Sequence, residues 1–211
     1  MTAPAIPDHH FIPKERIGNV IDAIYAFSMT LLVTTISVPP KYDRNSVAEP
    51  VQTIMANVLP DLLHYFIAFI ILALFWYFEH QRFRHLIHLD RPLLSLNIAS
   101  LAFVCLIPFT TNVAGDYPFD TFGSMLFEVN IFIIGIIAFA QWHYIRHHRS
   151  ELVPDLAENR IRREIRWSLV YPILAVIGFF IAIFSIPGSA TVFILSPFIM
   201  AWLFWKDPVK E

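Results

Sequence analysis

Charged residues are scarce in this sequence. Asp, Glu, Lys and Arg make up 15% of its 211 residues, whereas hydrophobic residues make up 56%. A soluble domain normally contains about 25% charged residues. The low charge and the 20 phenylalanines therefore argue against a soluble domain and indicate an integral membrane protein. The formal net charge of −2 does not suggest nucleic-acid binding, and we expect no nucleic-acid partner.

Cysteine is also nearly missing. The sequence has a single cysteine, Cys105, so it cannot form a disulfide within the chain and the redox compartment stays open. Residues 1–13 are polar and rich in proline, without the apolar core of a secretory signal. We therefore expect no cleavable signal peptide. No internal repeat, low-complexity segment or soluble domain stands out.

Long apolar runs are abundant instead. A transmembrane helix needs roughly 20 mostly apolar residues, and six segments qualify. We expect these spans at about residues 16–38, 59–78, 93–111, 121–144, 167–184 and 190–205. The predicted fold is all-α, with a cytoplasmic segment over residues 1–15, a six-helix transmembrane domain over 16–206 and a C-terminal tail over 207–211.

Basic residues indicate the orientation of the spans, because loops rich in Arg and Lys stay in the cytoplasm. Arginines concentrate in the link between the second and third spans and in the link between the fourth and fifth. The link between the third and fourth spans carries two aspartates and no basic residue. We therefore predict that both termini are cytoplasmic.

The first span is unusually polar for a membrane helix. At about 100° per residue, one stripe of side chains lies within about 60° of Phe27. This stripe comprises Ala23, Phe27, Thr30, Leu31, Thr34 and Val38, and the opposite face carries Tyr25, Met29, Leu32 and Ile36. Polar groups at membrane depth usually face a protein interior or a water-filled path, so the stripe favours a pore lining. Alternatively, the hydroxyl groups bond carbonyls of their own helix or join helices together.

The first three spans resemble those of the transmembrane protein 175 potassium channels, the family of the endolysosomal potassium channel and its prokaryotic relatives. Arg16 and Asp22 keep the spacing of the family's first-helix signature, and Thr30-Leu31-Leu32-Val33 matches its Thr-Leu-Leu-Val. Val20 and Ile21 stand where the signature has Phe-Ser. Ala26, Ile36 and Val38-Pro39 also match in the first span. Further matches are Trp76 followed by His80 in the second span, and Asn97, Leu101 and Pro108-Phe109-Thr110 in the third.

This resemblance implies a homotetramer in the plasma membrane of a prokaryote, with four first helices around a central pore. It implies an apolar constriction at Phe27 and Leu31, and coordination of permeant potassium ions by Thr30 and Thr34. Ala23 and Val38 would continue the lining. A polar network of Arg16, Asp22, His80 and Asn97 would join the first three helices.

The chemistry of such a pore is limited by what the sequence lacks. No TVGYG-like loop is present, so a filter of backbone carbonyls is not expected and ions would meet side-chain hydroxyls and retained water. Weak, neutral ligands favour an ion that dehydrates easily, which predicts modest selectivity for potassium over sodium. Whether protons also pass stays open. The expected partners are membrane lipid and K⁺, without a resident cofactor.

A secondary transporter and a membrane enzyme are the alternatives to a channel. A secondary transporter would need broken helices and midplane charges in matched halves, and neither is clear. A membrane enzyme would need clustered catalytic acids or metal ligands, and we expect the chain not to be an enzyme. His143 and His147 have a spacing that suits a metal, but no carboxylate or cysteine joins them. Glu128 has two interpretations, a proton or ion site and a group at the membrane interface, of which we prefer the second.

Overall fold

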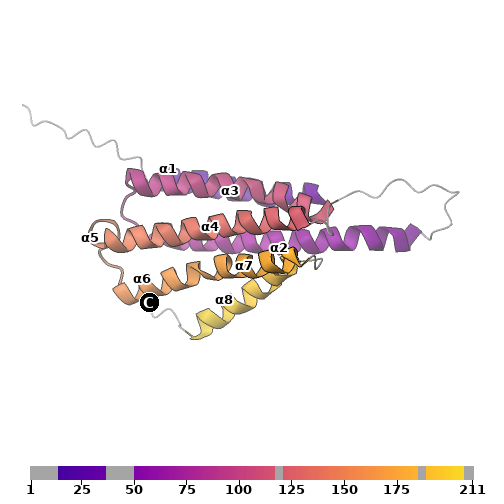
Figure 1. Cartoon of the computed structure of the whole chain (residues 1–211). Coiled ribbons are helices and arrows are strands. Elements are labelled where there is room, and N and C mark those ends of the chain that lie inside the picture. Colours follow the sequence, from indigo (N-terminus) through magenta and orange to yellow (C-terminus); the bar gives the residue numbers. More distant parts are fainter. Residues whose placement is uncertain (1–13, 37–49, 117–120, 185–188, 207–211) are drawn as a thin grey trace, which may run out of the picture.

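A computed structural model describes residues 14–36, 50–116, 121–184 and 189–206 (Figure 1). Over these ranges the chain is helical and contains no strand, which confirms the all-α prediction. The elements are α1 Lys14–Leu31, the 3₁₀ helix η1 Leu32–Thr35, α2 Pro50–His85, α3 Arg91–Asp116, α4 Thr121–His147, α5 Arg149–Leu152, α6 Glu158–Ser168, α7 Val170–Ile183, the 3₁₀ helix η2 Ser189–Ile194 and α8 Leu195–Lys206.

Five helical segments are long and apolar enough to cross a membrane. They are Lys14–Thr35, Val58–His85, Arg91–Asp116, Thr121–His147 and Glu158–Ile183. The sixth apolar segment, Thr191–Lys206, is shorter. At about 1.5 Å per residue it reaches about 24 Å, whereas the hydrocarbon core is about 30 Å thick. Five of the six predicted spans are therefore present at full length, and the predicted terminal segments lie largely outside the described residues.

Two of the helices extend well beyond the predicted spans. The second span was predicted over residues 59–78, but α2 continues past Glu79 and Arg82. These two side chains form an ion pair one turn apart and are 5% and 2% exposed, so their charges are compensated inside the bundle. The fifth span was predicted to begin at Trp167, but α6 begins at Glu158. This helix has one buried face and one arginine-rich face, a pattern that a search for continuous apolar runs does not detect.

The helices form a bundle in which α3 packs along α4, and α4 packs along α7. Its core contains large aliphatic side chains from several helices, such as Leu72, Val104, Ile107 and Ile131. α1 contacts α2 and α3 and lies beside α3 at the edge of the bundle (Figure 1). Many aromatic and aliphatic side chains, including Phe180 and Phe198, point outward. An apolar exterior of this kind is what a bilayer would cover.

The proline inside α3 has a polar neighbour on α4. Pro108 cannot donate the backbone hydrogen bond that an α-helix normally makes at its position. Asn130 Nδ2 donates to the Phe103 carbonyl at 3.2 Å and approaches Thr110 Oγ1 at 3.4 Å. Asn130 therefore binds the proline-containing part of α3 to α4 through the buried interior.

α4 and α7 approach each other closely at a glycine. A Cβ atom added to Gly135 would lie 2.4 Å from Cδ and 3.1 Å from the backbone nitrogen of Pro172. Both atoms belong to a rigid ring and its backbone, so no flexible side chain can move away. The two helices can lie this close only because position 135 has no side chain.

This contact predicts that Gly135→Ala lowers the free energy of unfolding by about 1–3 kcal/mol through overpacking. Gly18→Ala is the matched control, because no atom lies within 4 Å of a Cβ added there and alanine is the better helix former by up to about 1 kcal/mol. Thermal melting in detergent should show a lower midpoint for Gly135→Ala and an equal or higher midpoint for Gly18→Ala. Equal midpoints for the two variants would contradict the proposed close contact.

Candidate functional site

α1 is attached to the bundle through one face. Its buried side chains are Ile21, Tyr25 and Ser28, followed by Leu32 and Thr35 in η1. These positions recur every three or four residues, as one helical stripe does. Tyr25 is 2% exposed, whereas Phe27, two residues further on, is 63% exposed. Tyr25 and Leu32, which the sequence places opposite Phe27, therefore pack against other helices of the bundle.

The predicted stripe lies on the opposite side of α1. Ala23, Phe27, Thr30 and Thr34 are exposed, and Leu31 is half-buried. Val38, the last predicted member, lies outside the described residues. No other described helix of the chain covers this face, which is therefore free to meet lipid, water or another copy of the chain.

The hydroxyl groups of the stripe have defined directions. Thr30 Oγ1 donates to the Phe27 carbonyl at 2.7 Å, and Thr34 Oγ1 donates to the Leu31 carbonyl at 2.6 Å. Bonding to their own helix, one of the two interpretations left open above, thus occurs, three residues back. A hydroxyl has one hydrogen to donate and two acceptor lone pairs. With the hydrogen held by the helix, each oxygen keeps acceptor capacity that a cation or water can use.

The helix geometry changes within this region. The pore interpretation assumed a regular α-helix, but the chain adopts a 3₁₀ helix over Leu32–Thr35. In a 3₁₀ helix, residues three apart eclipse each other. The transition therefore brings Thr34 nearer to alignment with Leu31 than an α-helix would.

A hydrogen bond between helices fixes α1 to α2 close to the predicted polar network. Trp76 Nε1 donates to Asp22 Oδ1 at 2.8 Å, and the rings of Trp76 and His80 lie 5.7 Å apart. Asp22 and His80 are thus brought together through Trp76. The sequence suggested a Trp-His pair at this tryptophan but gave no sign that its indole donates to Asp22.

The other two residues of the predicted network lie elsewhere. Arg16 is exposed on α1, and Asn97 is buried in α3, where its Nδ2 approaches the Leu93 carbonyl of its own helix at 3.4 Å. Within the described residues, no hydrogen bond joins Arg16 or Asn97 to Asp22. The structure therefore brings together only part of the predicted set.

Glu128 is buried between helices. Its side chain is 1% exposed and faces α7 at Gly178, where an added Cβ would lie 2.5 Å from the carboxyl group. The apolar residues that follow Glu128 in sequence gave no indication of this placement, because the space is created by a glycine on another helix. Burial among helices does not fix the level of Glu128 in the bilayer, so its position at the membrane interface stays a prediction.

The two histidines near the end of α4 contact each other and their own helix. The rings of His143 and His147 lie 4.5 Å apart, and His147 Nδ1 lies 2.9 Å from the His143 carbonyl. Across the described ranges, no three or more His, Cys, Asp or Glu side chains come together in a way that could hold a metal ion.

The apolar bundle and its five long spans define a multi-pass membrane protein. Residues 16–108 match the family model described as "Endosomal/lysosomal potassium channel TMEM175". This segment runs from α1 through most of α3 and includes the described part of the candidate face. Residues 16–108 therefore belong to the TMEM175 family.

Individual relatives agree with this assignment. The bovine endosomal/lysosomal proton channel TMEM175 is 32% identical over 142 residues, which cover 64% of this chain and 30% of the bovine protein. A potassium channel of Streptomyces collinus is 26% identical over 102 residues, or 48% of each protein. The matched regions thus span less than half the length of these relatives.

A solved structure extends the similarity to the whole bundle. The crystal structure of a lysosomal potassium-selective channel TMEM175 homolog from Chamaesiphon minutus matches with a TM-score of 0.73 at 20% sequence identity. The match covers 90% of this chain and 97% of that one. The second half of the chain, for which the sequence offered only span count and charge, therefore shares this fold.

The Asp22–Trp76 bond predicts that Trp76→Phe lowers the free energy of unfolding by about 1 kcal/mol, because a donor to a charged acceptor is lost at a partly exposed site. Asp22→Asn should cost less, since it keeps an acceptor oxygen. Trp205→Phe is the control, because Trp205 is 82% exposed. Melting midpoints in detergent that fall equally for Trp76→Phe and Trp205→Phe would contradict a specific role for the bond.

Proposed function

We propose that this protein is a potassium channel in which four copies of the chain surround a central pore lined by α1. The carrying observation is the uncovered face of α1, with Phe27, Thr30, Leu31 and Thr34 in order along it. A single chain leaves this face without a protein partner. A ring of four chains would enclose the four faces around a central axis. The names of the Streptomyces and Chamaesiphon relatives support potassium as the permeant ion.

Coordination of the ion is assigned to Thr30 and Thr34. Both hydroxyl hydrogens are directed to carbonyls of the same helix, so the oxygens can accept from water or contact a cation. Four copies would place a ring of neutral oxygens around the axis. Such a ring binds ions weakly and favours potassium, whose hydration shell is removed more easily than that of sodium.

The constriction is assigned to Phe27, with Leu31 as the next apolar layer. Four exposed aromatic rings facing one axis would form a narrow apolar ring, and such rings stop conduction by expelling water. Ala23 would line the pore on one side of Phe27, and Val38 the opposite end of the lining. In this arrangement the closed state depends on an apolar ring that excludes water, without a blocking segment or an ion pair across the pore.

Proton passage is a second candidate activity, because the bovine relative is named a proton channel. The stripe has no His, Asp or Glu from Ala23 to Thr34. Protons would therefore have to move along water and threonine hydroxyls, without transfer through a titrating side chain. We further propose the plasma membrane of a prokaryote as the location, with both termini in the cytoplasm, and a transport role without enzymatic activity.

Thr30→Val should reduce potassium selectivity, since valine keeps the shape of the side chain but removes the oxygen. With potassium on one side of a planar bilayer and sodium on the other, tenfold selectivity corresponds to about 59 mV. The reversal potential of Thr30→Val should move toward zero, by at least about 20 mV for a roughly twofold loss of selectivity.

Thr35→Val is the matched control for this measurement. Thr35 donates to a carbonyl three residues back, at 2.8 Å, as Thr30 does, but it is buried against the bundle. Its replacement should leave the reversal potential unchanged. Equal shifts in both variants, or a shift in Thr35→Val alone, would contradict the assignment of Thr30 to the pore. Selective coupled uptake without current would favour a transporter.

Phe27→Ala should increase the open probability or unitary current several-fold, because a smaller side chain widens the apolar ring and lets water enter. Val33→Ala is the control: Val33 is also exposed, in η1, but lies about 80–120° from Phe27 around the helix axis. Single-channel recording would distinguish the two variants. An unchanged current in Phe27→Ala, with the protein intact, would remove Phe27 from the conduction path.

A further inference from the structure

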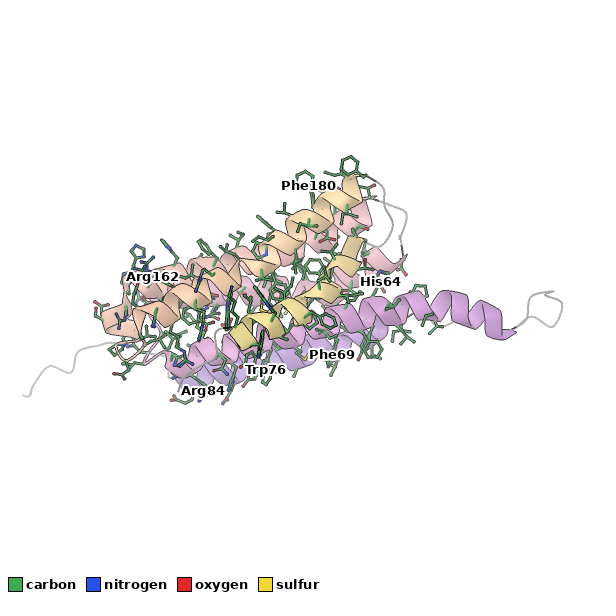
Figure 2. The ribbon with its side chains drawn as sticks, turned by 90° about the horizontal axis from the view of Figure 1, so that it is seen from below. His64, Phe69, Trp76, Arg84, Arg162 and Phe180 are labelled. Atoms are coloured by element: carbon green, nitrogen blue, oxygen red, sulfur yellow. The ribbon has the colours of Figure 1, made fainter. Side chains whose placement is uncertain are left out.

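A cavity of about 490 Å³ lies where the last turns of α2 and α4 meet α6 and the end of α8. Its volume is within the range of about 300–1,000 Å³ that is usual for small-molecule sites. The cavity is separate from the candidate pore face, since α1 contributes no residue to its lining. Arg84, one of its lining residues, lies toward the end of the bundle away from Phe180 in Figure 2.

One part of the cavity wall is basic. Arg84, in the last turn of α2, is exposed, and Arg160 of α6 is half-buried. Within the described residues, neither guanidinium group forms an ion pair. The carboxylate in the lining, Glu164, is paired with Arg163 at 3.6 Å and also lies within electrostatic reach of Arg160. His85 also lines the cavity and lies within electrostatic reach of both arginines, so the wall has an excess of positive charge.

The remaining wall is aromatic and begins at α8. The ring of Phe204 lies 4.7 Å from that of Trp167 in an edge-to-face arrangement. It also stacks on Phe78 of α2, with the ring centroids 6.2 Å apart. These contacts hold the end of the short helix α8 against α2 and α6 and form an apolar surface directly beside the arginines.

The combination selects an amphiphilic anion. A phosphate group carries the charge that two unpaired guanidinium groups would neutralise, and a hydrocarbon chain matches the aromatic wall. Both arginines lie at the basic end of long apolar helices, which is the level of lipid headgroups. Basic pockets between transmembrane helices at this level bind anionic lipid headgroups.

We propose that this cavity binds the phosphate headgroup of an anionic phospholipid, with Arg84 and Arg160 on the phosphate and the acyl chains against Phe78, Trp167 and Phe204. A bound lipid would then join α8 to α2 and α6 at the membrane surface. The site does not depend on the proposed channel function, because none of its residues belongs to the α1 face.

Native mass spectrometry of the full-length protein titrated with phosphatidylglycerol or phosphatidylcholine tests this proposal. The unmodified protein should retain phosphatidylglycerol in preference to phosphatidylcholine. Arg84→Gln and Arg160→Gln should each weaken phosphatidylglycerol binding about fivefold, and the double variant about 25-fold. Arg162→Gln is the matched control, because Arg162 lies on the same helix but points away and pairs with Glu158 at 3.0 Å.

Three results would overturn the proposal: equal retention of both lipids by the unmodified protein, unchanged phosphatidylglycerol binding in the double variant, or an equal loss in Arg162→Gln. Displacement of phosphatidylglycerol by millimolar inorganic phosphate would also overturn it and identify a site for a soluble anion. If the double variant fails to fold, Arg84→Gln decides alone, because Arg84 is exposed and its replacement leaves the buried contacts in place.

Discussion

The packing of α1 through a single face is the constraint that fixes which side chains the bundle presents to its surroundings. Ile21, Tyr25 and Leu32 are buried against the bundle, and the Asp22–Trp76 hydrogen bond fixes the helix to α2. With these contacts in place, the rotation of α1 about its own axis is determined. The hydroxyl-bearing side must then face outward, toward whatever adjoins the chain in the membrane.

The position of a threonine on this helix matters more than its local bonding. Thr30, Thr34 and Thr35 all donate to carbonyls three residues back, so their hydrogen bonds are alike. Thr35 faces the bundle and contributes to packing, whereas Thr30 and Thr34 face outward. In the proposed tetramer the same local bond therefore stabilises the fold at one position and prepares an oxygen for an ion at two others.

The sequence predicted what depends on periodicity along one helix and missed what depends on contacts between helices. The stripe containing Phe27 and Thr30 followed from residue spacing, because one buried face fixes the other. The length of α2 did not, because the pairing of Glu79 with Arg82 compensates charges that otherwise mark the end of a span. The burial of Glu128 depends on the space left by Gly178 on another helix. The change from an α-helix to a 3₁₀ helix at Leu32 was not indicated by the residues around it.

The central claim is that four copies of α1 surround the conduction path, and a single-particle reconstruction of the purified protein in lipid nanodiscs tests it most directly. We expect four chains around one axis, with Phe27, Thr30 and Thr34 the side chains nearest to that axis. A monomer, or an assembly whose axis is lined by another helix while the α1 face contacts lipid, would contradict it.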